Sequence, residues 1–226
     1  MSVTINGSNT PTAGGVTYGD GTQYATTSAG TSGQVLQSNG SSAPSWVTSS
    51  PSAMTLISTA TASSSASVTF TGLTSAYSSY LFILNGIAPS ANTQYLRVRT
   101  STNNGSSYDT TGYAYSIVGL NSNNVGYSAL GTDSSANSGT GFIGLNVDYL
   151  TTTGGGWNGT LLLINPSSAL ANKNFIISGA APINTTDASS INGFGSRLTT
   201  SAVNAVQFYF SSTNIASGTF KLYGIS

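Results

Sequence analysis

The chain has 226 residues and no net charge, and charged side chains make up only 4% of it. An ordinary soluble domain carries about 25% charged residues, so uncharged Ser, Thr, Asn, Gly and Tyr must cover much of this surface. Phosphate binding needs clustered Lys and Arg, and we therefore expect no nucleic-acid partner. No apolar run approaches the roughly 18 residues that a membrane-spanning helix needs, so we expect no membrane insertion.

The residue types that are missing limit the chemistry. The chain contains no Cys, no His and no Glu, which excludes disulfides, Cys- or His-ligated zinc and a Ser-His-Asp triad. A glycosidase would have to take both carboxylates of its pair from the few Asp residues. Asp148 lies in an expected strand, where we interpret it as an exposed residue rather than an acid or a calcium ligand. We predict that the protein is not an enzyme and has no cofactor or metal site, and we leave open whether its loops hold calcium.

Residues 1–50 are rich in Gly, Ser and Thr and carry only short apolar patterns. Val16 and Tyr18 alternate at period two before Asp20 and Gly21, a pair that favours a tight turn. Two isolated apolar pairs follow in a glycine-rich tract. We predict an extended N-terminal attachment arm over residues 1–50, whose apolar side chains anchor the chain in grooves of its partners. The predicted anchors are Tyr18, Val35, Leu36 and Trp46.

Residues 51–226 show short β-type patterns separated by turn residues, without a convincing helix. This spacing predicts one all-β domain, an antiparallel β-sandwich of jelly-roll type with about ten strands. The predicted strands are Met54–Ala60, Ala66–Thr71, Tyr80–Ile87, Gln94–Thr100, Tyr113–Val118, Phe142–Tyr149, Gly159–Ile164, Asn174–Gly179, Val203–Ser211 and Thr219–Gly224. The predicted polar loops are Ser101–Thr111, Asn121–Thr140, Thr151–Asn158 and Pro182–Ser201.

Alternation within these strands predicts which side chains face the core. Arg97 and Arg99 share one face of their strand, which must be the exposed one. Phe208 and Phe210 alternate with polar or tyrosine neighbours and are expected to point inward. With so little charge available to protect exposed strand edges, we expect the chain to associate with other copies or with a lattice.

Two tracts of the N-terminal segment are similar to sequences of tailed-bacteriophage virion proteins. The tract GVTYGDGTQYATTSA resembles an aromatic-x-Asp-Gly-Thr-x-Gln motif of tail fibres and related proteins, and departs from it in the spacing after Gln23. The tract GTSGQVLQSNGSSAPSWV resembles a Gly-x-x-Gly-Gln-Val-Leu-x-Ser-Asn-Gly-x-x-x-Pro-x-Trp linker of the same proteins. The last ten residues, SGTFKLYGIS, are similar to the closing strand of many phage virion β domains. The matching N-terminal positions are Tyr18, Asp20, Gly21, Thr22, Gly30, Gly33, Gln34, Val35, Leu36, Ser38, Asn39, Gly40, Pro44 and Trp46.

The resemblance implies a structural component of a tailed-phage virion, such as a tail fibre or a related appendage. Such a protein would be assembled in the host cytoplasm and exposed outside the cell after lysis. Its implied partners are other virion proteins and further copies of itself, with a homotrimer as our expectation. Two alternatives remain at this point: a protein that decorates the capsid, and a receptor-binding module that recognises a host surface glycan.

Aromatic residues in polar surroundings are our candidates for surface recognition. Tyrosine combined with Asn and Ser is typical of adaptable binding surfaces, although β-sheets favour tyrosine in any case. Trp157 follows three glycines and is expected either in the core, at an interface or as a sugar-stacking platform. The candidates are Tyr108, Tyr113, Tyr127 and Trp157.

Overall fold

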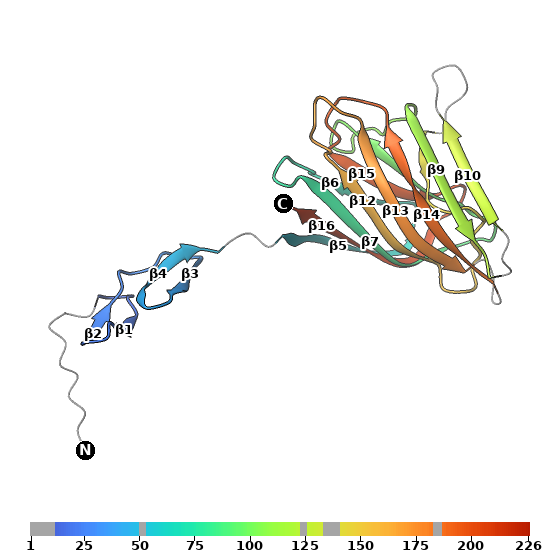
Figure 1. Ribbon diagram of the computed structural model, residues 1–226. Helices are drawn as coiled ribbons and strands as arrows, with labels where there is room; N and C mark the ends of the chain where they lie inside the picture. The colour runs from blue at the N-terminus through green and yellow to red at the C-terminus, as the bar shows by residue number, and fades with distance from the viewer. Residues whose placement is uncertain (1–11, 50–52, 123–125, 133–140, 183–186) are drawn as a thin grey trace. The chain divides into compact units, whose positions relative to one another are not determined.

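The computed structural model of the chain describes residues 12–49, 53–122, 126–132, 141–182 and 187–226 (Figure 1). Over these residues it contains strands and turns but no helix. The chain divides into two compact units, Met1–Ser52 and Ala53–Ser226.

The N-terminal unit contains two antiparallel hairpins (Figure 1). The first joins β1 (Thr17–Gly19) to β2 (Tyr24–Thr26), and the second joins β3 (Gln34–Asn39) to β4 (Ser42–Thr48). In the first turn one carboxylate oxygen of Asp20 accepts hydrogen bonds from the backbone N–H groups of Thr22 and Gln23, both at 2.8 Å. Gly21, with φ of 96°, takes the left-handed conformation that such a turn requires. Within the segment predicted to be an extended arm, the described residues therefore form two short hairpins.

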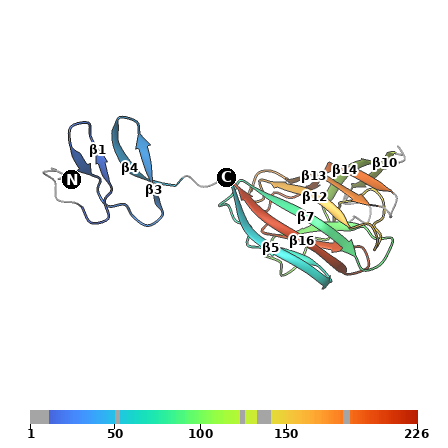
Figure 2. The same cartoon turned by 90° about the horizontal axis from the view of Figure 1, so that it is seen from below.

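The C-terminal unit is an antiparallel β-sandwich, as predicted. Its eight-stranded sheet runs in the order β10-β9-β14-β13-β12-β7-β16-β5, and its four-stranded sheet in the order β11-β8-β15-β6 (Figures 1 and 2). The strands are β5 (Met54–Ser65), β6 (Val68–Thr71), β7 (Ser79–Pro89), β8 (Leu96–Ser101), β9 (Tyr113–Leu120), β10 (Gly126–Thr132), β11 (Ile143–Gly144), β12 (Trp157–Ile164), β13 (Lys173–Pro182), β14 (Ala188–Arg197), β15 (Ala205–Phe210) and β16 (Ile215–Ile225).

The core lies between the two sheets and is built from alternate residues of each strand. Phe208 of β15 is its centre, with ring centroids 5.3 Å from both Phe82 and Phe220 and 6.4 Å from Phe70. All four rings are buried. Phe208 and Phe210 thus point inward, as their alternation predicted, and buried aromatic pairs of this kind stabilise the interior beyond their apolar area.

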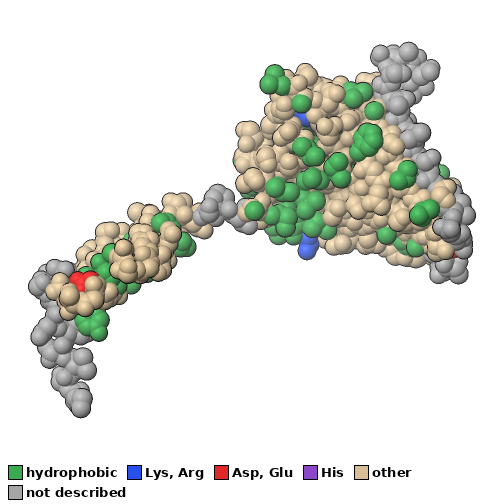
Figure 3. All heavy atoms as spheres, in the orientation of Figure 1, with side chains coloured by type: hydrophobic (Ala, Val, Ile, Leu, Met, Phe, Trp, Pro, Cys, Tyr) green, Lys and Arg blue, Asp and Glu red, His purple; other side chains and the backbone are tan. Residues whose placement is uncertain are grey.

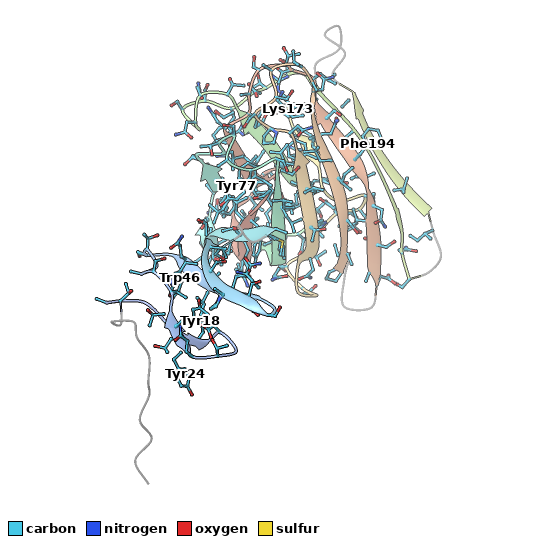
Figure 4. All side chains as sticks on the ribbon, turned by 60° about the vertical axis from the view of Figure 1, so that its left-hand side comes forward. Tyr18, Tyr24, Trp46, Tyr77, Lys173 and Phe194 are labelled. Atoms are coloured by element: carbon cyan, nitrogen blue, oxygen red, sulfur yellow. The ribbon has the colours of Figure 1, made fainter. Side chains whose placement is uncertain are left out.

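The closing strand β16 shows why glycine occupies one of its positions. A Cβ atom on Gly224 would lie 2.4 Å from the ring of Tyr77, which therefore packs directly on the backbone of the strand. The ring of Tyr77 also lies 5.7 Å from that of Tyr80, in an edge-to-face arrangement. Figure 4 labels Tyr77 beside the strands of the sandwich.

Strand β5 forms one edge of the eight-stranded sheet. Its register against β16 shifts between Leu222 and Tyr223, which leaves Ile57 as an extra, bulged residue. A bulge twists an edge strand and hinders another chain from adding to it. This edge is thus protected by backbone geometry where the chain has almost no charge to use.

Two strands lie where the sequence predicted loops. Strand β14 falls within the expected loop Pro182–Ser201, and β10 falls within the expected loop Asn121–Thr140, part of which lies outside the described residues. The predicted strand Phe142–Tyr149 shrinks to Ile143–Gly144. The prediction missed β14 because its inward positions include Gly193 and Gly195, where a Cβ would lie 2.3 Å from a carbonyl oxygen of β9 and 2.7 Å from Ile143. Close contact between neighbours, which alternation does not reveal, selects glycine there.

Candidate functional site

Trp46 holds the two N-terminal hairpins together. Its indole Nε1 donates hydrogen bonds to the carbonyl oxygen of Ser28 at 2.9 Å and to the hydroxyl of Thr27 at 3.2 Å. The buried Thr27 hydroxyl also accepts a hydrogen bond from the backbone of Val16 at 3.0 Å. The indole covers Gly30 so closely that a Cβ there would lie 2.6 Å from the ring. Gly30 and Trp46 of the second tract therefore form one internal contact, and Figure 4 labels Trp46 in the N-terminal unit.

A groove runs between the two hairpins of this unit. Its volume is about 600 Å³, and it is open to solvent. The residues that matter for its chemistry are Tyr18, Asp20 and Gly21 from the first hairpin and Leu36, Asn39 and Pro44 from the second. All six belong to the tracts GVTYGDGTQYATTSA and GTSGQVLQSNGSSAPSWV. The fold thus brings residues of two separate tracts to one surface.

The four predicted anchors have three different environments. Tyr18 and Leu36 line the groove, and Leu36 remains 40% exposed. Val35 is 49% exposed but does not line the groove, because neighbouring residues of a strand point to opposite faces. Trp46 is half-buried in contacts within its own unit. Leu36 lies directly opposite Trp46 on the paired strand β4, and Tyr18 and Trp46 also line a second cavity of about 550 Å³. Tyr18, Leu36 and Trp46 are therefore brought together, whereas Val35 lies apart from them.

A second candidate surface covers the outer side of the four-stranded sheet, and we call it the Arg–aromatic face. The Arg97 guanidinium lies 4.0 Å from the ring centroid of Phe142. The Arg99 guanidinium lies 4.8 Å from the rings of both Tyr108 and Tyr209. As predicted, both arginines point outward from the same strand, β8. Cation–π contacts of this kind hold the two positive charges in fixed positions.

The Arg–aromatic face carries two positive charges that no carboxylate of the described residues neutralises. Neither Arg97 nor Arg99 forms an ion pair with any described residue, and Arg97 Nε is buried without a hydrogen-bond partner among them. Arg99 donates to the side chain of Gln207 at 2.7 Å. Burial raises the pKa of Tyr209, against a smaller lowering effect of the arginines, so this phenol stays neutral beside them. The result is a fixed positive surface with no carboxylate paired to it in the described part of the chain.

A small pocket of about 210 Å³ opens beside Arg97. The rest of its lining consists of Tyr95, Tyr115, Phe142, Gly144 and Asn146. Burial is the main cause that raises the pKa of Tyr115, and Arg97 lowers it by less. An arginine flanked by aromatic rings and an amide suits a ligand that combines an anionic group with a flat apolar surface.

The four predicted recognition residues have different outcomes. Tyr108 belongs to the Arg–aromatic face, and its hydroxyl donates to Thr69 at 3.3 Å. Tyr113 and Trp157 are both fully buried, so neither lies on a recognition surface, and the core alternative for Trp157 is confirmed. Trp157 instead donates from Nε1 to the carbonyl of Leu145 at 2.7 Å. Tyr127 lies in β10 opposite Gly119, and its side chain is outside the described part of the structure.

Sequence reasoning missed the aromatic partners of the two arginines. Phe142 and Tyr209 are far from β8 in sequence and reach it only through the strand pairing of the small sheet. The available signal was the Arg-x-Arg spacing, which placed both charges on one face but gave no hint of their neighbours.

Other chemistry finds little support among the described residues. They contain no group of three or more His, Cys, Asp or Glu that could hold a metal ion. Asp148 accepts a hydrogen bond from the backbone N–H of Tyr149 at 2.7 Å. No helix in the described ranges is long and apolar enough to cross a bilayer.

Comparisons with family models, with curated proteins and with solved structures each gave no match.

Proposed function

We propose that this protein is a structural component of a tailed-phage virion. In this proposal the N-terminal unit attaches the chain to the particle, and the β-sandwich is exposed on a tail fibre or a related appendage. The observation that carries the proposal is the groove between the two hairpins, because both tracts similar to phage virion sequences contribute to it.

The chemistry of the groove fits the attachment of another chain. Leu36 and Tyr18 offer apolar surface, and the exposed turn residues Asp20 and Gly21 line the groove beside them. Burying a side chain such as Leu36 contributes about 1.5–3 kcal/mol. The contribution of one such contact is modest, but the symmetric repetition of subunits multiplies it.

The proposal is tested on particles purified from cells that produce them together with the tagged chain. We expect the chain in the particles at a fixed copy number, and we expect Leu36→Ser to reduce that number strongly because it removes the apolar contact in the groove. Val35→Ser is the matched control, since Val35 is as exposed but points away from the groove. Absence of the chain from particles refutes the virion role, and equal loss in both variants refutes attachment through the groove.

The position of the chain in the particle follows from the same measurement. A capsid-decorating protein is present in the high copy number of the capsid lattice, whereas an appendage protein is present in the low copy number of the tail. Imaging of the tagged chain on intact particles separates the two.

The Arg–aromatic face favours a second candidate function, the recognition of a host surface glycan that carries carboxylate or phosphate groups. Arg97→Met removes one charge but keeps an apolar side chain against Phe142, and we expect it to abolish binding to acidic surface polysaccharide. Lys221→Met removes the same charge from the other sheet and should leave binding unchanged. Binding that both variants retain, or equal binding to neutral polysaccharide, contradicts this function.

A further inference from the structure

An unbroken row of apolar side chains crosses the outer face of the eight-stranded sheet. Each member of this apolar row pairs directly with the next on the neighbouring strand. In order across β5, β16, β7, β12, β13 and β14 the row consists of Leu56, Tyr223, Leu81, Leu162, Ile176 and Phe194. Directly opposite residues on adjacent strands touch through their side chains, so the row is one continuous surface.

The apolar row faces solvent. Leu56 and Phe194, at its two ends, are each 52% exposed, and Ile176 is 48% exposed. The members between them are half-buried by one another. Figure 3 shows hydrophobic side chains gathered on this face over β16, β7 and β12, and Figure 4 labels Phe194 on β14. Alternate residues of the same strands fill the core, so these side chains are not needed for it.

Further apolar residues widen the row along the strands. Ile83 lies in the next cross-strand row on one side, and Met54, Ile164 and Ile225 lie in the next row on the other side. Strands lie about 4.8 Å apart and rise about 3.4 Å per residue. The apolar row and its two flanking rows, which also hold polar residues such as Lys221 and Ser79, together measure about 30 by 20 Å, or about 600 Å², when side-chain width is included. Apolar side chains gathered on one face in this way often mark an interaction site.

This face carries almost no charge. Lys221 is the one charged side chain that points outward from the described strands β5, β16, β7, β12, β13, β14 and β9 of this sheet. The other polar residues of the flanking row that holds Lys221 and Ile83 are uncharged: Thr59, Thr160, Ser178 and Asn192. An apolar centre with a polar rim is the arrangement found in protein–protein interfaces.

We propose that the apolar row binds the same row of a second copy of this chain, so that two sandwiches pack face to face. A surface whose one outward charge, Lys221, lies outside the apolar row can meet its own copy with little repulsion, whereas a charged partner would lose solvation here and find no countercharge other than Lys221. The three rows of about 600 Å² and the uncharged residues beyond them on the same face, such as Thr61, Thr219 and Asn85, together approach the roughly 800 Å² that each partner of a standard interface buries. Edge-to-edge pairing through β5 is hindered by the bulge at Ile57.

The order of residues along the row fixes the centre of this contact. A twofold axis between β7 and β12 places Leu81 of each copy opposite Leu162 of the other. Each end of the row then lies opposite the other end of the partner's row. Packed sheets lie about 10 Å apart with their strands turned by about 30°, so the contacts nearest the axis are the most certain to form. Leu81 is therefore the position at which a substitution has the largest effect.

The oligomeric state of the full purified chain tests the proposal. Its mass is 22.8 kDa, and we expect a dimer in sedimentation equilibrium at micromolar concentration, in place of the homotrimer that the resemblance implied. Leu81→Lys brings two like charges together near the axis and should weaken association by at least about 100-fold. Leu170→Lys makes the same change at a loop residue that is 93% exposed and should leave the dimer intact. Circular dichroism and thermal unfolding of both variants show that the fold is retained.

Cross-linking gives a second measurement, in which the proposal predicts that a product forms rather than that association is lost. The chain has no cysteine, so Leu81→Cys introduces a unique thiol that a short bismaleimide reagent should join to its copy in a second chain. Leu170→Cys should not cross-link in this way. A monomeric wild-type chain, a trimer, or equal cross-linking of the two variants overturns the proposal. The test uses the isolated chain, so its outcome is independent of whether the protein is found in virions.

Discussion

Replacing Tyr113 with phenylalanine tests how the core of the sandwich is tied to its β8–β9 connection. The Tyr113 hydroxyl accepts a hydrogen bond from the backbone N–H of Thr100 at 2.8 Å and lies 3.0 Å from the hydroxyl of the same residue. It donates to the carbonyl of Asp109 at 3.4 Å. Because the ring is fully buried, Tyr113→Phe leaves the N–H of Thr100 without an acceptor, and this should cost about 1–3 kcal/mol of unfolding free energy at neutral pH.

Ionisation of the same hydroxyl makes the difference in unfolding free energy between the wild type and Tyr113→Phe depend on pH. Burial raises the pKa of Tyr113 from 10.0 to about 12. A phenol whose pKa is raised in the folded state contributes its full stability below the unfolded pKa and loses it as the pH rises through the folded one. This rise in the pKa of Tyr113 corresponds to about 3 kcal/mol of unfolding free energy. We therefore expect the advantage of the wild type over Tyr113→Phe to shrink between about pH 10 and pH 12 and to approach zero or reverse.

Urea unfolding of both proteins at a series of pH values measures this difference, and other titrating groups cancel because both proteins share them. Tyr149→Phe is the matched control, since Tyr149 is 42% exposed and its substitution should change stability by less than about 0.5 kcal/mol. A difference between wild type and Tyr113→Phe that stays constant up to the alkaline limit would refute the reasoning. A zero difference at neutral pH would show that the hydroxyl contributes nothing in the core.

Three further substitutions probe other contacts. Lys173 donates to the carbonyls of two loop residues at 2.5 and 2.6 Å and is fully buried, so Lys173→Met should cost about 2–3 kcal/mol in chemical unfolding. Gly30→Ala should displace the ring of Trp46 and shift its fluorescence toward that of exposed indole, while the sandwich keeps its unfolding transition. Hydrogen bonds from the backbone of its turn lower the pKa of Asp20, so the turn should persist above the ordinary carboxyl pKa and open only as the pH falls through the lowered one. Asp20→Asn should remove this dependence in the amide shifts of the turn measured by NMR.

Much of the sandwich could be predicted because alternation reports on burial within one strand. The spacing of Phe208 and Phe210 placed both side chains in the core, and that of Arg97 and Arg99 placed both on the outer face. Strands whose inward positions carry glycine gave no such signal. At β14 the choice of Gly193 depends on contact with β9, a strand distant in sequence.

The candidate surfaces were less predictable than the strands because they depend on register between distant segments. Trp157 and Tyr113 stand in polar surroundings in the sequence, yet each finds a hydrogen-bond partner inside the core, which allows a polar aromatic residue to be buried. The apolar row takes one residue from each of its strands, so the pattern within a single strand does not predict it. Leu56 and Tyr223 come from opposite ends of the sandwich sequence and become neighbours only when β5 pairs with β16.

The two outer faces of the sandwich have different chemistry, and this makes the proposals compatible. A face-to-face pair of sandwiches buries the eight-stranded sheets at its centre. The four-stranded sheets then form its outer sides, each with Arg97 and Arg99 held against aromatic rings. Such a pair would present two identical Arg–aromatic faces pointing away from each other. If these faces bind an acidic surface glycan, the pair binds it bivalently, and Leu81→Lys should weaken attachment to a repetitive glycan surface while leaving binding of a single short glycan unchanged.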